Sequence, residues 1–229
     1  MIRCACLASA EDAPADAEVL FRFDDDTWAP VETGAGTLIL RRGGEARAAG
    51  LLEAGVPQVL LGEAAMADAE LPGRLATRFG AARVGLFVPA RRMVVSWSFD
   101  TVSNADFRVV TPSLCEPGWE ILRADGSATG IRVDWWLGEM NERAPGTVLV
   151  QVDMRADTDL NLCAGLVEDL GERLWIAPAG RSALPALADW IVYGKATRIA
   201  LPPALFGRRT ALLGDFLTPA DVAPAKEEA

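Results

Sequence analysis

The stretch LLEAGVPQVLLGEAAMADAELPGRLATRFGAARVGLFV, residues 51–88, decides the fold because helical and strand patterns alternate along it at short intervals. Apolar spacing and chain breakers predict a helix over residues 45–54, a strand over 56–61, a helix over 68–79 and a strand over 83–88. Gly55 directly follows the first helix and is a residue typical of helix C-caps. Strands and helices that alternate with short connections are typical of a parallel sheet.

The same rhythm extends in both directions from this stretch. Further strands are predicted over residues 1–7, 18–23, 36–40, 147–152, 174–177 and 190–192, and further helices over 132–143, 160–170 and 182–188. Residues 92–126 interrupt the rhythm with short β-like runs, so we expect an insertion after the fifth strand. Eight strands favour a closed (β/α)8 TIM barrel over an open, doubly wound sheet.

The length of the chain fits one such barrel. An ordinary (β/α)8 barrel has about 250 residues. This chain has 229, so we expect a single domain over residues 1–229 with shortened first units. Residues 219–229 are rich in Pro, Ala and Glu and are expected to form a flexible tail.

The chain is acidic, with a formal net charge of -10 and a pI of about 4.6. A negative surface repels phosphate backbones and anionic headgroups, so neither nucleic acid nor a membrane is an expected partner. The sequence has no signal-peptide pattern at its start and no apolar run of about 18 residues. These features predict a soluble, cytoplasmic protein.

The sequence contains no histidine. This excludes Ser-His-Asp and Cys-His nucleophilic catalysis, and also the usual zinc and non-haem iron ligand sets. The four cysteines, at positions 4, 6, 115 and 163, form no CxxC pair and are expected to be reduced, buried thiols. We expect no metal and no cofactor, and any proton transfer depends on Asp, Glu, Lys, Cys or the single Tyr193.

Three stretches contain short motifs in a shared order and spacing. Residues 51–80 contain GEAA after a strand and RFG before the next, residues 118–154 contain TGI before a helix, and residues 174–196 contain LWIAPAG and VYGKA. Together they resemble the HisA/HisF-like barrels of histidine biosynthesis, above all the cyclase subunit of imidazole glycerol phosphate synthase. The resemblance covers most of the chain from residue 51 onward and implies the same barrel fold.

The resemblance implies that an Asp at the end of the first strand and another at the end of the fifth act as general acid and base. The matching letters here are CLA at residues 6–8 and PAR at residues 89–91, which place Ala8 and Pro89 at those positions. Neither side chain carries a proton, and loss of an acid–base group typically costs about 10²–10⁴-fold in rate. The standard histidine-pathway reaction is therefore not expected, and Ser9 and Glu11 are the alternatives if the first strand aligns differently.

The resemblance also implies phosphate sites at turns after strands three and four, and after strands seven and eight. After strand three, Gly43 and Gly44 keep the family's glycines, and Arg41 and Arg42 add positive charge. After strand four the family's GTAA reads GEAA, and the carboxylate of Glu63 would repel a phosphate. We therefore expect the strand-four turn to have lost phosphate binding.

The turns after strands seven and eight keep more of the pattern. PAG at residues 178–180 follows the seventh strand and is itself followed by Arg181, and GKA at residues 194–196 follows the predicted eighth strand. The predicted phosphate-binding residues are Gly180, Arg181, Gly194 and Lys195. The alternative is that both cations are ordinary solvated loop residues.

Acidic residues follow the sixth strand, where the family has DRDGT. Asp153 and Asp157 are the candidate catalytic residues, and Arg155 and Thr158 keep letters of the motif. Register decides which side chain points inward, and a purely structural role at the barrel mouth is the alternative. The acidic run at residues 24–26 is expected to be a solvated loop rather than a metal site.

These observations leave three functional hypotheses. The first is a divergent barrel that binds a phosphorylated small molecule, sugar-like or nucleotide-like, and acts as a lyase or isomerase if it is an enzyme. The second is a catalytically inactive barrel that serves as a subunit or scaffold, with a protein partner or a second copy of the chain. Because related barrels occur in organisms with tetrahydromethanopterin-linked one-carbon metabolism, the resemblance allows that setting. The third is unchanged histidine-pathway activity, against which Ala8 and Pro89 argue.

Overall fold

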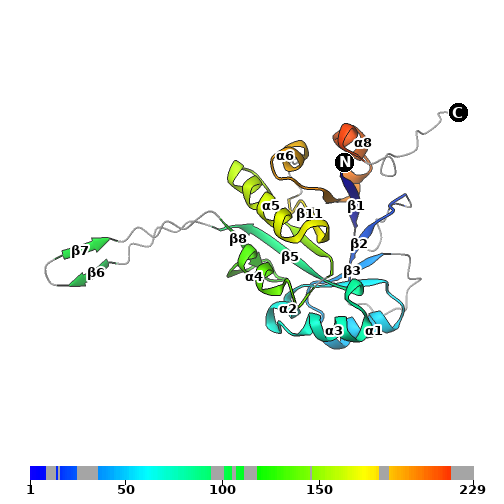
Figure 1. Cartoon of the computed structure of the whole chain (residues 1–229), viewed down its shortest axis with the longest axis horizontal. Helices are drawn as coiled ribbons and strands as arrows, with labels where there is room; N and C mark the ends of the chain where they lie inside the picture. Colours follow the sequence, from blue (N-terminus) through cyan, green and yellow to red (C-terminus); the bar gives the residue numbers. More distant parts are fainter. Residues whose placement is uncertain are drawn as a thin grey trace.

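Eight parallel strands close into a barrel (Figure 1). The computed structural model describes residues 1–8, 14, 16–24, 36–93, 101–104, 107–110, 118–144, 146–180 and 186–217. In ring order the strands are β1 (Arg3–Ala8), β2 (Leu20–Phe23), β3 (Thr37–Leu40), β4 (Gln58–Leu61), β5 (Val84–Arg92), β10 (Val148–Gln151), β11 (Leu174–Ala177) and β12 (Arg198–Leu201). The parallel pairings of β10 with β5 and of β12 with β1 complete the ring. The predicted (β/α)8 barrel is confirmed.

Helices cover the outside of the barrel. They are α1 (Glu45–Glu53), α2 (Glu63–Ala67), α3 (Leu71–Phe79), α4 (Val133–Met140), α5 (Asp157–Leu170), α6 (Leu187–Val192), α7 (Pro203–Phe206) and α8 (Arg209–Leu213), with single 3₁₀ turns at Ala81–Arg83, Gly171–Arg173 and Gly214–Phe216. Among the described residues between β1 and β3, none is helical, which agrees with shortened first units. No helix of the described part is both long and apolar enough to span a bilayer.

Alternation along the strands divides the core into two layers. Side chains that face the barrel axis form one cluster: Ala5, Leu7, Phe21, Ile39, Leu60, Phe87, Leu149, Trp175, Ala177 and Ala200. The neighbouring strand residues pack outward against the helices. Two edge-to-face ring pairs fill the interior, Phe21 with Trp175 at 5.4 Å and Phe23 with Phe87 at 5.6 Å between centroids. The barrel axis is therefore packed with side chains.

The described part of the insertion after β5 contains further short strands, as predicted, and these pair in antiparallel fashion. β5 runs beyond the barrel and pairs with β8 (Trp119–Leu122), and β8 pairs with β9 (Ala128–Arg132). Strands β6 (Thr101–Asn104) and β7 (Phe107–Val110) form a separate two-stranded sheet, which lies apart from the barrel in Figure 1. The predicted tail at residues 219–229 lies outside the described residues.

The prediction for the eighth strand is wrong. Residues 190–192 belong to helix α6, where Trp190 is buried in the outer layer, and the eighth strand is β12. A short apolar run such as WIV fits a buried helix turn as well as a strand, so the pattern alone does not separate the two. The helix predicted over residues 68–79 corresponds to α3, which begins at Leu71, and the short helix α2 that precedes it was not predicted.

Candidate functional site

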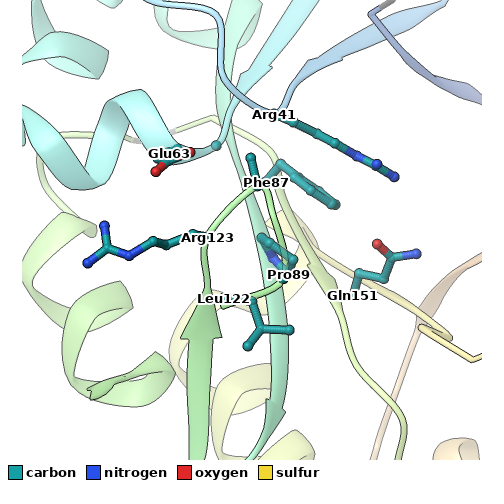
Figure 2. Close-up of a pocket in the computed structure, with 10 residues that line it drawn as sticks. Arg41, Glu63, Phe87, Pro89, Leu122, Arg123 and Gln151 are labelled. Carbon is teal, nitrogen blue, oxygen red and sulfur yellow. The ribbon is translucent and has the colours of Figure 1, made fainter. Parts of the chain in front are cut away.

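A cavity of about 150 Å³ lies at the carboxyl ends of the barrel strands, the end at which (β/α)8 barrels bind their ligands (Figure 2). Its lining comes from the turns after β3 and β4, from β5 and β10, and from the β8–β9 hairpin: Arg41, Gly62, Glu63, Phe87, Pro89, Leu122, Arg123, Ala124, Gly126 and Gln151. The inserted hairpin therefore supplies one wall of the cavity.

Aromatic packing holds one of the cationic side chains across the mouth. The guanidinium carbon of Arg41 lies 3.9 Å from the centroid of the Phe23 ring, in cation–π geometry. Phe23 in turn packs edge-to-face on Phe87, which lines the cavity. Figure 2 shows Arg41 and Gln151 on one side of Phe87, and Glu63 and Arg123 on the other.

A second cavity of about 200 Å³ adjoins the first and shares Arg41 and Ala124 with it. Its other lining residues are Asp24 and Arg42. The Asp24 carboxylate is already paired with Arg47, at 2.6 Å between Oδ1 and Nη2. The described residues that line the two cavities thus include three arginines, Arg41, Arg42 and Arg123, and one carboxylate for which no ion pair is found, Glu63. This part of the mouth is positive within a strongly acidic chain.

The turn amides beside these arginines are used by the backbone. The N–H of Gly62 donates to Leu40 O at 2.9 Å, and the N–H of Glu63 donates to Arg41 O at 3.0 Å. A Cβ at position 62 would lie 2.9 Å from both of those carbonyl oxygens, so the close approach of the two turns requires glycine. Anion binding on this side depends on the guanidinium groups rather than on these two amides.

The turn after β11 holds a carboxylate of the protein itself. Asp153, which follows β10, accepts the N–H groups of Ala179 at 3.0 Å and Gly180 at 2.7 Å on its Oδ1 atom. Its Oδ2 atom lies 3.4 Å from Arg155 Nη2. Asp153 therefore points toward the predicted phosphate turn, and Asp157 is exposed at the start of α5; neither residue lines the two cavities.

The structure does not bring the predicted phosphate residues together. Gly194 and Lys195 precede β12, so they lie at the amino-terminal end of the barrel, opposite Gly180. Lys195 has a left-handed φ of 56° and donates from Nζ to Val192 O at 2.9 Å, and thereby caps the end of α6. Their predicted position at the mouth followed from the misplaced eighth strand. Arg181 lies outside the described residues.

Comparison with known proteins gives a consistent set of relatives, although no family model matches the chain. The imidazole glycerol phosphate synthase subunit HisF of Trichormus variabilis is 28% identical over 204 residues, which cover 86% of this chain and 70% of the relative. The same subunit from Microcystis aeruginosa is 26% identical over 209 residues, 89% of this chain and 73% of the relative. The Nostoc sp. subunit is 26% identical over 204 residues, 86% and 69%. The chain is a divergent HisF-like barrel.

The two positions at which the resemblance implies catalytic carboxylates, Ala8 and Pro89, lie in different environments of this HisF-like barrel. Pro89 lines the mouth cavity, where its ring offers no proton donor or acceptor. Ala8 lies in the outer layer of the core with Cys6, while Leu7 between them faces the axis. The letter match at β1 therefore does not mark the axis-facing residue at the end of that strand. Ser9 and Glu11 lie outside the described residues.

Asp159 is a buried polar residue of the site region that is absent from the predicted candidates. Its side chain is 1% exposed and accepts the indole N–H of Trp119 at 3.0 Å and the backbone N–H groups of Arg155 and Ala156 at 2.9 and 3.0 Å. It occupies the third position of α5, where an acidic side chain can accept the backbone N–H of the residue before the helix. This position relative to the helix start is the sequence feature from which Asp159 could have been predicted. Asp159 thereby joins the inserted strand β8 to the loop that carries Asp153.

The three described cysteines of this HisF-like barrel are buried, and none of them lines either cavity. Burial raises the pKa of Cys163 to about 12, and burial together with the charge of Asp16 raises that of Cys6 to about 11. No group of three or more His, Cys, Asp or Glu residues in the described part could hold a metal ion. Of the acidic run at residues 24–26, Asp24 pairs with Arg47, and residues 25 and 26 lie outside the described residues.

Proposed function

We propose that the chain binds a phosphorylated small molecule, sugar-like or nucleotide-like, across the two adjoining cavities at the barrel mouth. Arg41 and Arg42, which both line the second cavity, contact the phosphoryl group. The observation that carries the proposal is Arg41, which lines both cavities and is held in place by the ring of Phe23. Imidazole glycerol phosphate, in the name of the curated relatives, is itself a phosphorylated small molecule.

The charges of the mouth favour such a ligand. Guanidinium groups bind phosphate oxygens through charge-assisted hydrogen bonds that are about twice as strong as neutral ones. Because Phe23 restricts Arg41 before binding, less side-chain entropy is lost when the ligand arrives. The Arg47–Asp24 pair leaves Asp24 compensated, so it opposes an anion only weakly. The two cavities together reach the lower end of the range of small-molecule sites, about 300 Å³ and upward.

The reaction of the curated relatives is not part of this proposal. Pro89 takes the place of an acid–base residue in the cavity, and the carboxylate that a bound ligand meets there is Glu63. If the chain is a lyase or isomerase, Glu63 is the group with which it moves a proton. Expression in a histidine-requiring strain that lacks HisF tests this point, and we expect no rescue of growth. Rescue would overturn this part of the proposal.

Calorimetric titration of the purified chain with inorganic phosphate tests the binding site. Arg41→Ala is expected to weaken binding at least tenfold, because it removes a charge-assisted contact and the one charged side chain that lines both cavities. Arg78→Ala is the matched control, since Arg78 is exposed near the end of α3 and pairs with Glu53. Equal weakening in both variants, or none in Arg41→Ala, would contradict the proposed site.

A second candidate is a catalytically inactive barrel that acts as a subunit or scaffold. It is favoured by Pro89 in the cavity and by Asp153, whose Oδ1 is committed to two amides of the protein. Light scattering of the purified chain, together with calorimetric titration with phosphate, separates the two candidates. Phosphate binding by a monomer supports the first candidate, and a stable oligomer that binds no phosphate supports the second.

A further inference from the structure

The carboxylate of Asp153 occupies the place of a bound anion on the turn after β11. Its Oδ1 atom receives two backbone N–H groups, from Ala179 and Gly180, at 3.0 and 2.7 Å. Successive backbone N–H groups that converge on one oxygen form an anion site. Here the anion is part of the chain, and a phosphoryl group could reach these amides only by displacing it.

Gly180 is fitted to this internal contact. A Cβ at position 180 would lie 2.6 Å from Asp153 Oδ2, so any other residue there would force this carboxylate to move. The glycine therefore serves the approach of the carboxylate. Arg155 Nη2 lies 3.4 Å from the same Oδ2 atom and compensates part of the charge.

The neighbouring turn after β12 has also lost donors. The short helix that follows the eighth strand of a barrel commonly completes a phosphate site with its first N–H groups. In this chain α7 starts with Pro203 and is capped by Pro202, and proline has no N–H. The N–H groups of Leu205 and Phe206 donate to Pro202 O, both at 2.9 Å. Among the described donors of these two turns, the N–H groups of Ala179, Gly180, Leu205 and Phe206 are thus engaged within the chain, and Pro202 and Pro203 have none.

From these contacts we infer that the barrel mouth binds one phosphoryl group and not two, because Asp153 is a built-in anion on the β11 side. The ligand is therefore a monophosphate, with its phosphate at the arginines and its uncharged end toward β11. The inference rests on the proposed function, since it takes the arginine side as the phosphate site. It adds the ligand's charge pattern and orientation.

Titration with inorganic phosphate, followed by calorimetry and by ³¹P NMR, counts the sites. We expect one phosphate per wild-type chain, lost in Arg41→Ala, and a second phosphate per chain in Asp153→Ala, where the amides of Ala179 and Gly180 are released. Asp169→Ala is the control, because it removes an equal charge from an exposed position of α5. It is expected to stay at one phosphate.

The outcomes separate this inference from the proposal on which it rests. Wild-type binding that survives Arg41→Ala overturns the proposed site. Three results overturn the inference of a built-in anion but leave the proposed site standing. They are one phosphate per chain in Asp153→Ala, two phosphates per chain in the wild type, and a second phosphate in Asp169→Ala as well as in Asp153→Ala. Should Asp153→Ala fail to fold, the wild type is compared on fructose 6-phosphate and fructose 1,6-bisphosphate. A preference for the bisphosphate below about tenfold supports the inference, and a preference of about tenfold or more overturns it.

Discussion

At the scale of single residues, Glu63 places a carboxylate in the wall of the mouth cavity. Its letter alone argues that the strand-four turn is lost to phosphate. In the structure it lines the same cavity as Arg41 and Arg123, so its charge opposes an anion that those two attract. A carboxylate that lowers the affinity for an anion in this way is expected where it also contacts the reacting part of the ligand.

The Glu63→Gln substitution is therefore expected to tighten phosphate binding. Two unit charges about 4 Å apart in water interact by about 1 kcal/mol, which corresponds to roughly fivefold in affinity. Calorimetry at low ionic strength measures the gain, and in about 1 M salt the gain should shrink because the Debye length falls to about 3 Å. Weaker binding by Glu63→Gln would instead mean that the carboxylate accepts hydrogen bonds from the ligand.

The thiols give a second prediction at this scale. Cys6 and Cys163 have pKa values raised to about 11 and 12, so both stay protonated in the folded chain at neutral and mildly alkaline pH. Above the pKa of about 8.5 of an exposed thiol, the unfolded chain ionises while the folded chain does not. These two residues therefore lower the free energy of unfolding as the pH rises from there toward their folded pKa values.

Thiol labelling measures this protection. In a Cys115→Ser background, Cys4, Cys6 and Cys163 remain, and all three are buried. We expect no rapid reaction with an aromatic disulfide reagent at pH 8 in the native state, and reaction of all three after denaturation. Rapid native labelling of Cys163 would show that the packing of α5 on the barrel opens readily.

At the scale of elements, the contacts of α5 explain how the insertion and the mouth are joined. Asp159 accepts three hydrogen bonds, one from Trp119 on β8 and two from the loop that carries Asp153. The geometry of that loop, and with it the position of Asp153, depends on a residue of the helix that follows it.

Removal of this carboxylate should destabilise the chain strongly. Asp159→Ala leaves a buried indole N–H and two backbone N–H groups without their acceptor, and we expect a loss of about 3 kcal/mol in the free energy of unfolding. Asp159→Asn retains an acceptor oxygen and is expected to lose about half as much. Urea titration followed by circular dichroism measures both variants, and equal losses would argue that the charge, not the hydrogen bonding, matters.

The elements also show what the sequence could and could not predict. Residues 51–88 are predictable because glycine breakers and helical spacing agree there with the observed α3 and β5. The prediction of the eighth strand is wrong because the apolar run WIV is too short to show a helical or a strand period. The predicted position of Gly194 and Lys195 at the mouth is wrong for the same reason, since both residues lie at the opposite end of the barrel. At β1 the motif letters are recognisable, but side-chain direction depends on register, which placed Ala8 outside the axis layer. Contacts such as Asp153 with Gly180 join residues far apart in the chain and leave no local pattern.

At the scale of the whole molecule, charge and packing both restrict the ligand to the mouth. The chain carries a net charge of -10, yet Arg41, Arg42 and Arg123 gather at one end of the barrel. Opposite signs on one surface guide an anionic ligand to a single region, and the association rate should fall with salt. The axis below is filled by aromatic rings, so the ligand does not enter the barrel interior.

The barrel as a whole depends on those rings, because the axis layer is small and each strand contributes few side chains to it. Trp175 is 4% exposed and packs edge-to-face on Phe21, so Trp175→Ala opens a cavity in the centre of the closed sheet. We expect a loss of about 3–5 kcal/mol in the free energy of unfolding, measured by urea titration. Trp135→Ala is the matched control, since Trp135 is 61% exposed on α4 and its loss should cost no more than about 0.5 kcal/mol. A small effect of Trp175→Ala would mean that the eight strands can collapse around the missing ring, and that the outer layer of helices, rather than the axis, holds the barrel closed.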